Sequence, residues 1–208
     1  MKQDAVTQYC NMMEEVKRRT RVIHAFAANT TNAIYKATTI ESIYLQFRKI
    51  LELIAFGSLV ANESVYSSVY ADYAKEWRAK RLLERLEQVN PGFYPRPIEE
   101  IPSKRPGVKM DWLDIASGYL TKDEFIELYE QSSSLIHSPN PFKPPTDYAS
   151  AEKRMKEWDE KIRRLLNCHQ IHLVGDPNIY LIHMKETDGK VHHNTFGPSA
   201  GPPGAISK

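Results

Sequence analysis

The chain has little cysteine, no long apolar run and almost no excess of charge, and each of these absences excludes a class of protein. Only two of its 208 residues are cysteines, Cys10 and Cys168, and they stand far apart. A disulfide framework is therefore not expected, and a reducing cytoplasmic location fits best. No apolar run approaches the roughly 20 residues that cross a bilayer, so we expect no membrane partner. The charged N-terminal segment also lacks the apolar region of a signal peptide.

The formal net charge is only +2, from 28 basic and 26 acidic residues. This balance excludes a nucleic-acid module held by bulk charge alone, although local contact with RNA stays open. The chain also has no glycine-rich phosphate-binding loop and no Gly-x-Ser-x-Gly motif. We therefore expect no cofactor.

Apolar residues at helical spacing fill most of the chain and predict about five helices. The segment from Arg48 to Phe56 is apolar nearly all round, which is typical of a helix at the centre of a bundle. Thr121 and Glu124 have the spacing of a capping box, which marks the start of a helix. The five expected helices cover residues 2–28, 31–61, 64–89, 121–138 and 150–167.

Prolines interrupt the helical pattern over residues 90–108, which predicts an ordered loop that packs along the bundle. After Cys168 the apolar period changes from helical to two, which predicts strands over residues 169–174, 179–184 and 191–196. The predicted fold is mainly α, a helical bundle with a small C-terminal three-stranded antiparallel sheet. Its expected parts are a bundle over residues 1–168, an appended β-meander over 169–196 and a disordered tail over 197–208.

Two local patterns carry candidate chemistry, and the first is the pair formed by Arg48 and Glu52. These residues are four positions apart, so they share one face of an otherwise apolar helix. One interpretation is a structural ion pair between packed helices, which the sequence favours. The other is that the Arg48 guanidinium contacts an anion, since its planar fork suits a phosphate.

The second pattern surrounds His137, at the last turn of the expected fourth helix, and includes Ser138 and Asn140. A histidine at this position interacts favourably with the C-terminal end of the helix dipole. It is also the one side chain that titrates near neutral pH unaided, which suits a general acid or base. Since the sequence shows no partner of known geometry, the structural interpretation is slightly favoured.

The strings RKILELIAF (Arg48–Phe56) and SLIHSPNPF (Ser134–Phe142) resemble the HEPN superfamily, helical-bundle proteins of prokaryotic defence and toxin–antitoxin systems. The resemblance implies a homodimer whose protomers form a composite, metal-independent site. In that site the RNA 2′-hydroxyl attacks the adjacent phosphate, a histidine moves protons and an arginine stabilises the developing charge. Catalytic members have an arginine within two turns before the histidine, but residues 130–136 contain none.

From this resemblance we predict His137 and Arg48 as catalytic residues, with Arg48 replacing the missing arginine. Asn140, Ser138 and Glu52 are predicted to bind substrate. The predicted function is therefore binding of RNA or a protein partner in a defence or stress system, with metal-independent endoribonuclease activity. The alternative is a catalytically inactive HEPN-like interaction or scaffold module.

Three further groups of residues, histidines, basic residues and tyrosines, each have a functional and a simpler interpretation. Five of the seven histidines fall in the terminal strands, where His172, His183 and His192 are expected on one face and are potential zinc ligands. No cysteine or acidic set accompanies them at a recognised spacing, so no metal ligand is assigned. The basic residues Arg78, Lys80, Arg81 and Arg85 alternate with glutamates, which is typical of a solvated helix face. The nearby Tyr66, Tyr70 and Tyr73 suit base stacking, but their helical spacing is more typical of a core.

Overall fold

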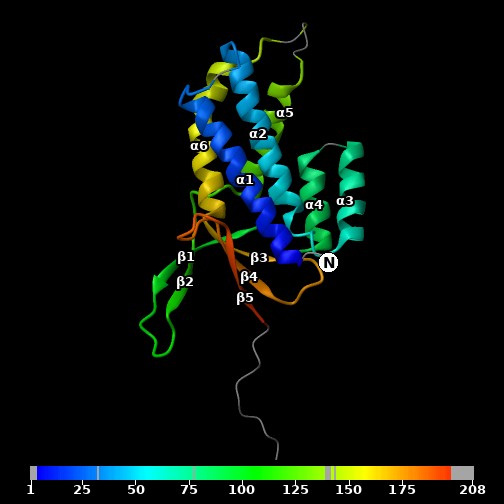
Figure 1. Cartoon of the computed structure of the whole chain (residues 1–208). Helices are drawn as coiled ribbons and strands as arrows, with labels where there is room; N and C mark the ends of the chain where they lie inside the picture. The colour runs from blue at the N-terminus through cyan, green and yellow to red at the C-terminus, as the bar shows by residue number, and fades with distance from the viewer. Residues whose placement is uncertain (1–3, 32, 77, 139–141, 143, 198–208) are drawn as a thin grey trace, which may run out of the picture.

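In the computed structural model a bundle of helices stands on one side of an antiparallel sheet (Figure 1). The structure describes residues 4–31, 33–76, 78–138, 142 and 144–197. Over these residues the helices are α1 (Ala5–Ala27), α2 (Lys36–Gly57), α3 (Glu63–Glu76), α4 (Ala79–Val89), α5 (Lys122–Ile136) and α6 (Tyr148–Leu166). The strands are β1 (Arg96–Pro102), β2 (Met110–Asp114), β3 (Cys168–His172), β4 (Ile179–His183) and β5 (His192–Phe196).

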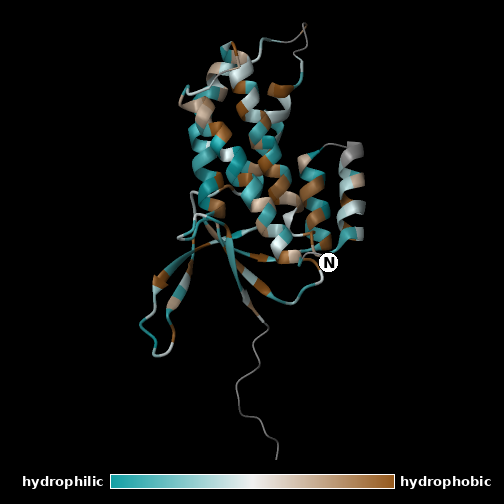
Figure 2. Ribbon diagram, viewed as in Figure 1, coloured by the Kyte–Doolittle hydropathy of each residue, from teal (hydrophilic) through white to brown (hydrophobic). Residues whose placement is uncertain are grey.

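Helix α2 is the centre of the bundle, as its apolar sequence predicts. It packs most extensively against α5 and α1, and its residues from Ile50 to Phe56 are buried except for Glu52 and Leu53. Figure 2 shows the contrast between the apolar lower half of α2 and the polar outer side of α6. Burial of this apolar surface is the main contribution to the stability of the bundle.

The capping box predicted at the start of α5 is confirmed. The Thr121 hydroxyl accepts a hydrogen bond from the Glu124 backbone N–H, and the Glu124 carboxylate accepts one from the Thr121 N–H. Two orphan donors at the helix N-terminus are thereby satisfied. The box fixes where α5 begins. The C-terminal turn of α5 lies beside α4.

The predicted sheet was too small. It has five strands in the order β2–β1–β3–β4–β5, all antiparallel, and β1 and β2 precede α5 in the chain rather than following α6. Part of the predicted proline-rich loop over residues 90–108 is therefore strand β1. The prolines are tolerated because β1 pairs with β3 only at Arg96 and Pro97, and with β2 from Ile98 to Pro102. Each residue of β1 is thus paired on one edge only, and a missing proline N–H removes little.

The three strands predicted after Cys168 are confirmed as β3, β4 and β5, each slightly shorter than expected. Ile171 faces Tyr180 across the β3–β4 ladder, and both belong to the same buried cluster as the helices, together with Leu173 and Ile182. One face of the sheet therefore completes the bundle core. Of the tail predicted over residues 197–208, only Gly197 is among the described residues.

His169 joins the sheet to the bundle. Its ring is fully buried, its Nδ1 lies 2.7 Å from the Leu166 carbonyl oxygen and its Nε2 lies 2.8 Å from the Tyr9 hydroxyl. Because a carbonyl oxygen only accepts, Nδ1 carries the proton and the neutral Nε2 accepts from Tyr9. One imidazole thus links α1, α6 and β3.

The predicted helix over residues 64–89 is two helices, α3 and α4, which raises the helix count to six over the described residues. Arg78 precedes α4 with an extended backbone (φ −101°, ψ 117°), which ends the helical geometry. Both helices still face the core through Val69, Tyr73 and Leu82, so the apolar period continues across the break. The two helices form a pair at the side of the bundle (Figure 1).

Cys10 and Cys168 are both free thiols, so no disulfide joins them. Among the described residues, we find no helix that combines the length and apolar character needed to cross a bilayer.

Candidate functional site

Arg48 lies in a buried network between α2 and α5 rather than on an open surface. Its side chain is 7% exposed, and its Nε lies 3.3 Å from a carboxylate oxygen of Glu52. The other guanidinium nitrogens donate to the hydroxyls of Ser133 and Tyr129, and the guanidinium carbon lies 4.3 Å from the centre of the Tyr129 ring. Each of the three guanidinium nitrogens therefore donates a hydrogen bond to another side chain of the protein.

Glu52 is held by the same network. Besides Arg48, it accepts hydrogen bonds from Lys49 Nζ at 2.9 Å and from the Tyr73 hydroxyl at 3.1 Å. Burial raises the pKa of the Tyr73 hydroxyl well above its usual value, so Tyr73 is a neutral donor at physiological pH. These contacts tie α2, α3 and α5 together and favour the structural interpretation of the Arg48–Glu52 pair.

His137 is the residue that follows α5, and its side chain is exposed. It lines a pocket of about 710 Å³ between α4 and α5, together with Tyr129, Ser133 and Ser134 of α5. Tyr129 and Ser133 also contact Arg48, so the buried network lies directly behind one wall of this pocket. Ser138 is exposed beside His137, and Asn140 lies outside the described residues.

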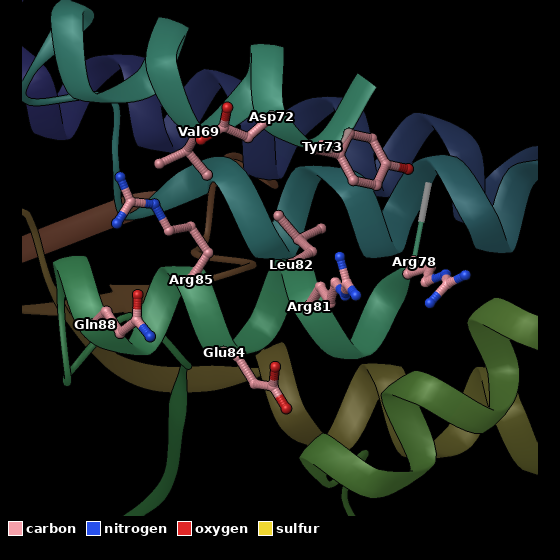
Figure 3. Close-up of a pocket in the computed structure, with 9 residues that line it drawn as sticks. All are labelled: Val69, Asp72, Tyr73, Arg78, Arg81, Leu82, Glu84, Arg85 and Gln88. Carbon is pink, nitrogen blue, oxygen red and sulfur yellow. The ribbon is translucent and has the colours of Figure 1, made fainter. Parts of the chain in front are cut away.

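Helix α4 supplies the cations of the site. Arg78 and Arg81 line the α4–α5 pocket, and they also line a second pocket of about 440 Å³ between α3 and α4. In Figure 3 the two guanidinium groups lie near one another at the N-terminal end of α4, and Arg85 lies about one turn further along. Glu84 points away from α3 in this view. Arg78 and Arg81 therefore form a basic ridge between the two pockets.

The electrostatics of this ridge favour an anion. The side chains of Arg78, Lys80 and Arg85 are exposed and make no ion pair with any part of the chain that the structure describes. Arg78 stands at the N-cap of α4, and no side chain caps the first N–H groups of this helix. These N–H groups and the helix dipole add positive potential at the same place. Three carboxylates, those of Asp72, Glu84 and Glu130, line the pockets and limit the positive charge.

The structure thus brings together some predicted site residues and separates others. Arg48 and Glu52 lie behind the pocket wall, whereas His137 faces the pocket with Arg78 and Arg81. The sequence predicts only a solvated helix face for these two arginines. The sequence does contain one signal that groups these arginines. Arg78, Arg81 and Arg85 are three and four positions apart, which places them on one stripe of a helix.

The tyrosines of α3 serve mainly to pack. Tyr73 is buried. Tyr66 and Tyr70 stack on one another and pack with tilted rings against Phe56, with ring centroids 5.4 to 6.1 Å apart. Tyr70 is still 49% exposed. The core interpretation therefore describes Tyr73 fully and Tyr70 only in part.

The structure does not bring His172, His183 and His192 together as one set of zinc ligands, which agrees with the absence of an assigned metal ligand among them. His172 and His183 share a face but lie at opposite ends of the β3–β4 ladder, where they pair with Ile179 and Cys168. His192 is opposite His183, but its Nε2 lies 3.0 Å from the Asp188 carboxylate. His172 therefore lies too far along the strands to bind the same metal ion as His183.

Comparisons of this chain with protein-family models, with curated proteins and with solved structures found no match.

Proposed function

We propose that this protein binds RNA along the α4 ridge and cleaves it without a metal ion, using His137 for proton transfer. The observation that carries the proposal is the α4–α5 pocket, which is lined by both His137 and the arginines Arg78 and Arg81. In the HEPN-like chemistry that the sequence resembles, a histidine and an arginine act on the same phosphate. Here the arginine comes from α4 rather than from the helix that bears the histidine.

Each group has a role that its position supports. His137 takes the proton of the 2′-hydroxyl as its oxygen attacks the adjacent phosphorus. The P–O5′ bond breaks, and the departing 5′-oxygen takes a proton from a solvent water molecule. The guanidinium of Arg78 or Arg81 donates to the phosphate oxygens, on which negative charge develops. The uncapped N–H groups at the start of α4 add to this stabilisation.

Replacing both Arg78 and Arg81 by alanine should weaken RNA binding by at least tenfold. The negative slope of log affinity against log salt should also become shallower by about 1.4, because each lost phosphate contact with a single strand contributes about 0.7. Fluorescence anisotropy with a labelled single-stranded RNA at several salt concentrations measures both. The matched control is Lys153→Ala with Lys156→Ala on α6, which removes the same charge from another exposed helix. An equal loss of affinity in the control would contradict the proposed site, because it would show that RNA binding depends only on the overall charge.

The cleavage reaction is tested separately with His137→Ala. In EDTA, wild-type protein should cut a mixed pool of structured and single-stranded RNA, and the variant should be slower by about 10²- to 10⁴-fold, the usual contribution of general acid–base catalysis. His192→Ala, which removes another exposed histidine, should cut normally. Single-turnover rates measure the effect. A cleavage rate in His137→Ala that equals the wild-type rate would contradict the catalytic role of His137.

RNA binding without cleavage by the wild type would favour the inactive interaction module instead. A specific observation supports that alternative, because the predicted catalytic Arg48 is enclosed by Glu52, Tyr129 and Ser133. The homodimer, the cytoplasmic location and the place in a defence or stress system remain predictions from the sequence.

A further inference from the structure

Three side chains with metal-binding atoms converge on the side of the sheet near α6, away from the α4 ridge. Glu100 comes from β1, Cys168 begins β3 and His183 ends β4. Cys168 and His183 are directly opposite one another in the β3–β4 ladder, and the His183 Nε2 lies 2.8 Å from a Glu100 carboxylate oxygen. One ligand atom from each residue lies within 4.8 Å of the other two. The strand register therefore holds a sulfur, a nitrogen and an oxygen donor around one point.

This set of donors is the kind that zinc prefers. Zn²⁺ binds thiolate at about 2.3 Å, imidazole at about 2.0–2.1 Å and carboxylate at about 2.0–2.2 Å, usually with tetrahedral geometry. Those lengths place the donors roughly 3.3–3.6 Å from one another. Binding of an ion therefore requires side-chain rotations that bring the three donors to these separations and lengthen the Glu100–His183 hydrogen bond.

The second nitrogen of His183 provides an independent observation. Nδ1 is buried and has no hydrogen-bond partner within the described part of the chain, but it lies 3.7 Å from a carboxylate oxygen of Glu186. A histidine that binds a metal through one nitrogen usually donates the other N–H to a carboxylate or carbonyl oxygen. Glu186 is placed to accept that hydrogen bond after a small rotation, which would leave Nε2 for the metal.

The charges around the site suit a divalent ion with one open position. The Glu100 carboxylate and a Cys168 thiolate together neutralise Zn²⁺, and Glu186 adds further negative charge beside His183. The three residues line a cleft of about 880 Å³, which also contains Arg163, Arg164 and Lys185. A fourth position that opens to this cleft is accessible to water, as in zinc sites with three protein ligands.

We propose that Glu100, Cys168 and His183 bind one Zn²⁺ ion, with a fourth coordination position open to the cleft. The competing explanation is a Glu100–His183 hydrogen bond beside an inert thiol. The two differ in the role of sulfur, because only the zinc site requires Cys168 as a ligand. The site is remote from His137, so the proposal is independent of the proposed RNA chemistry.

The test uses the full chain, stripped with a chelator and titrated with Co²⁺ as a spectroscopic probe and then with Zn²⁺ as the competitor. We expect one equivalent of Co²⁺ and a thiolate-to-cobalt charge-transfer band, which Zn²⁺ abolishes. The band should be absent in Cys168→Ser and present in Cys10→Ser, which removes the other thiol. His183→Gln and the nearly isosteric Glu100→Gln should bind at least 10- to 100-fold more weakly, the loss caused by removing even an outer partner of a ligand. His192→Gln should bind as the wild type does.

Circular dichroism on each variant separates loss of a ligand from loss of the fold, and Glu100→Gln keeps the test valid if Cys168→Ser does not fold. Absence of stoichiometric binding by the wild type would overturn the proposal. It would also be overturned by a charge-transfer band that persists in Cys168→Ser, or by one that depends equally on Cys10.

Discussion

Arg48→Ala is expected to lower the free energy of unfolding by about 3 kcal/mol, a large part of the stability of a domain of this size. The substitution leaves the Glu52 carboxylate, whose side chain is only 17% exposed, without its buried partner. It also removes the donors to Ser133 and Tyr129. Loss of one member of a buried pair costs about 3–5 kcal/mol, and we expect the lower end because Lys49 and Tyr73 still contact Glu52. Urea unfolding at neutral pH measures the change.

Two controls make this result specific. Lys49→Ala removes an exposed partner of the same carboxylate and should cost less than about 1 kcal/mol. Combining Arg48→Met with Glu52→Gln removes both charges and should recover much of the loss, since no buried charge then stays unpaired. A stable Arg48→Ala protein that has lost RNA cleavage would instead restore Arg48 as a catalytic residue.

The second large effect is expected from acid and depends on His169. Burial lowers the pKa of this imidazole from 6.5 to about 4 in the folded protein. Well above pH 6.5 the ring is neutral in both the folded and the unfolded protein and has no effect on the free energy of unfolding. Below that pH the unfolded chain takes up a proton that the folded chain does not, so the free energy of unfolding falls as the pH falls. The loss is complete below about pH 4 and amounts to about 3 kcal/mol.

Urea unfolding of the wild type and of His169→Asn at pH 7 and pH 4.5 measures this effect. Asparagine retains a side-chain N–H for the Leu166 carbonyl oxygen but does not titrate. The variant should be less stable at pH 7, and its stability should decline less between the two pH values. Carboxylates also titrate in this range, so the difference between the two slopes is the quantity that matters. Parallel slopes would show that the pKa of His169 does not differ between the folded and the unfolded protein.

The elements that the sequence predicts well are those whose signals are local. The apolar period found α2 and the three terminal strands, and the spacing of Thr121 and Glu124 found the start of α5. The break at Arg78 was missed because the apolar stripe runs through it. Strand β1 was missed because its prolines are unfavourable in a fully paired strand, and nothing local shows that each residue of β1 has one paired edge.

The candidate site shows the same division between local and tertiary information. The pairing of Arg48 with Glu52 follows from four residues of separation, but the approach of Tyr129 and Ser133 depends on how α5 packs. Likewise, no spacing in the sequence joins Glu100 to Cys168 and His183, because the three come from three strands. Ligand motifs with short spacing are visible in a sequence, whereas a set assembled by sheet register is not.

The position of β1 in the chain also sets an order of events during synthesis. Arg96 and Pro97 pair with Gln170 and His169, so their partner strand leaves the ribosome only after α5 and α6. Until then β1 and β2 form at most a two-stranded hairpin, which is marginally stable alone and has an edge open to other chains. The sheet therefore closes only once the segment after α6 has been translated. A ribosome that stalls before β3 would leave a nascent chain with this edge exposed.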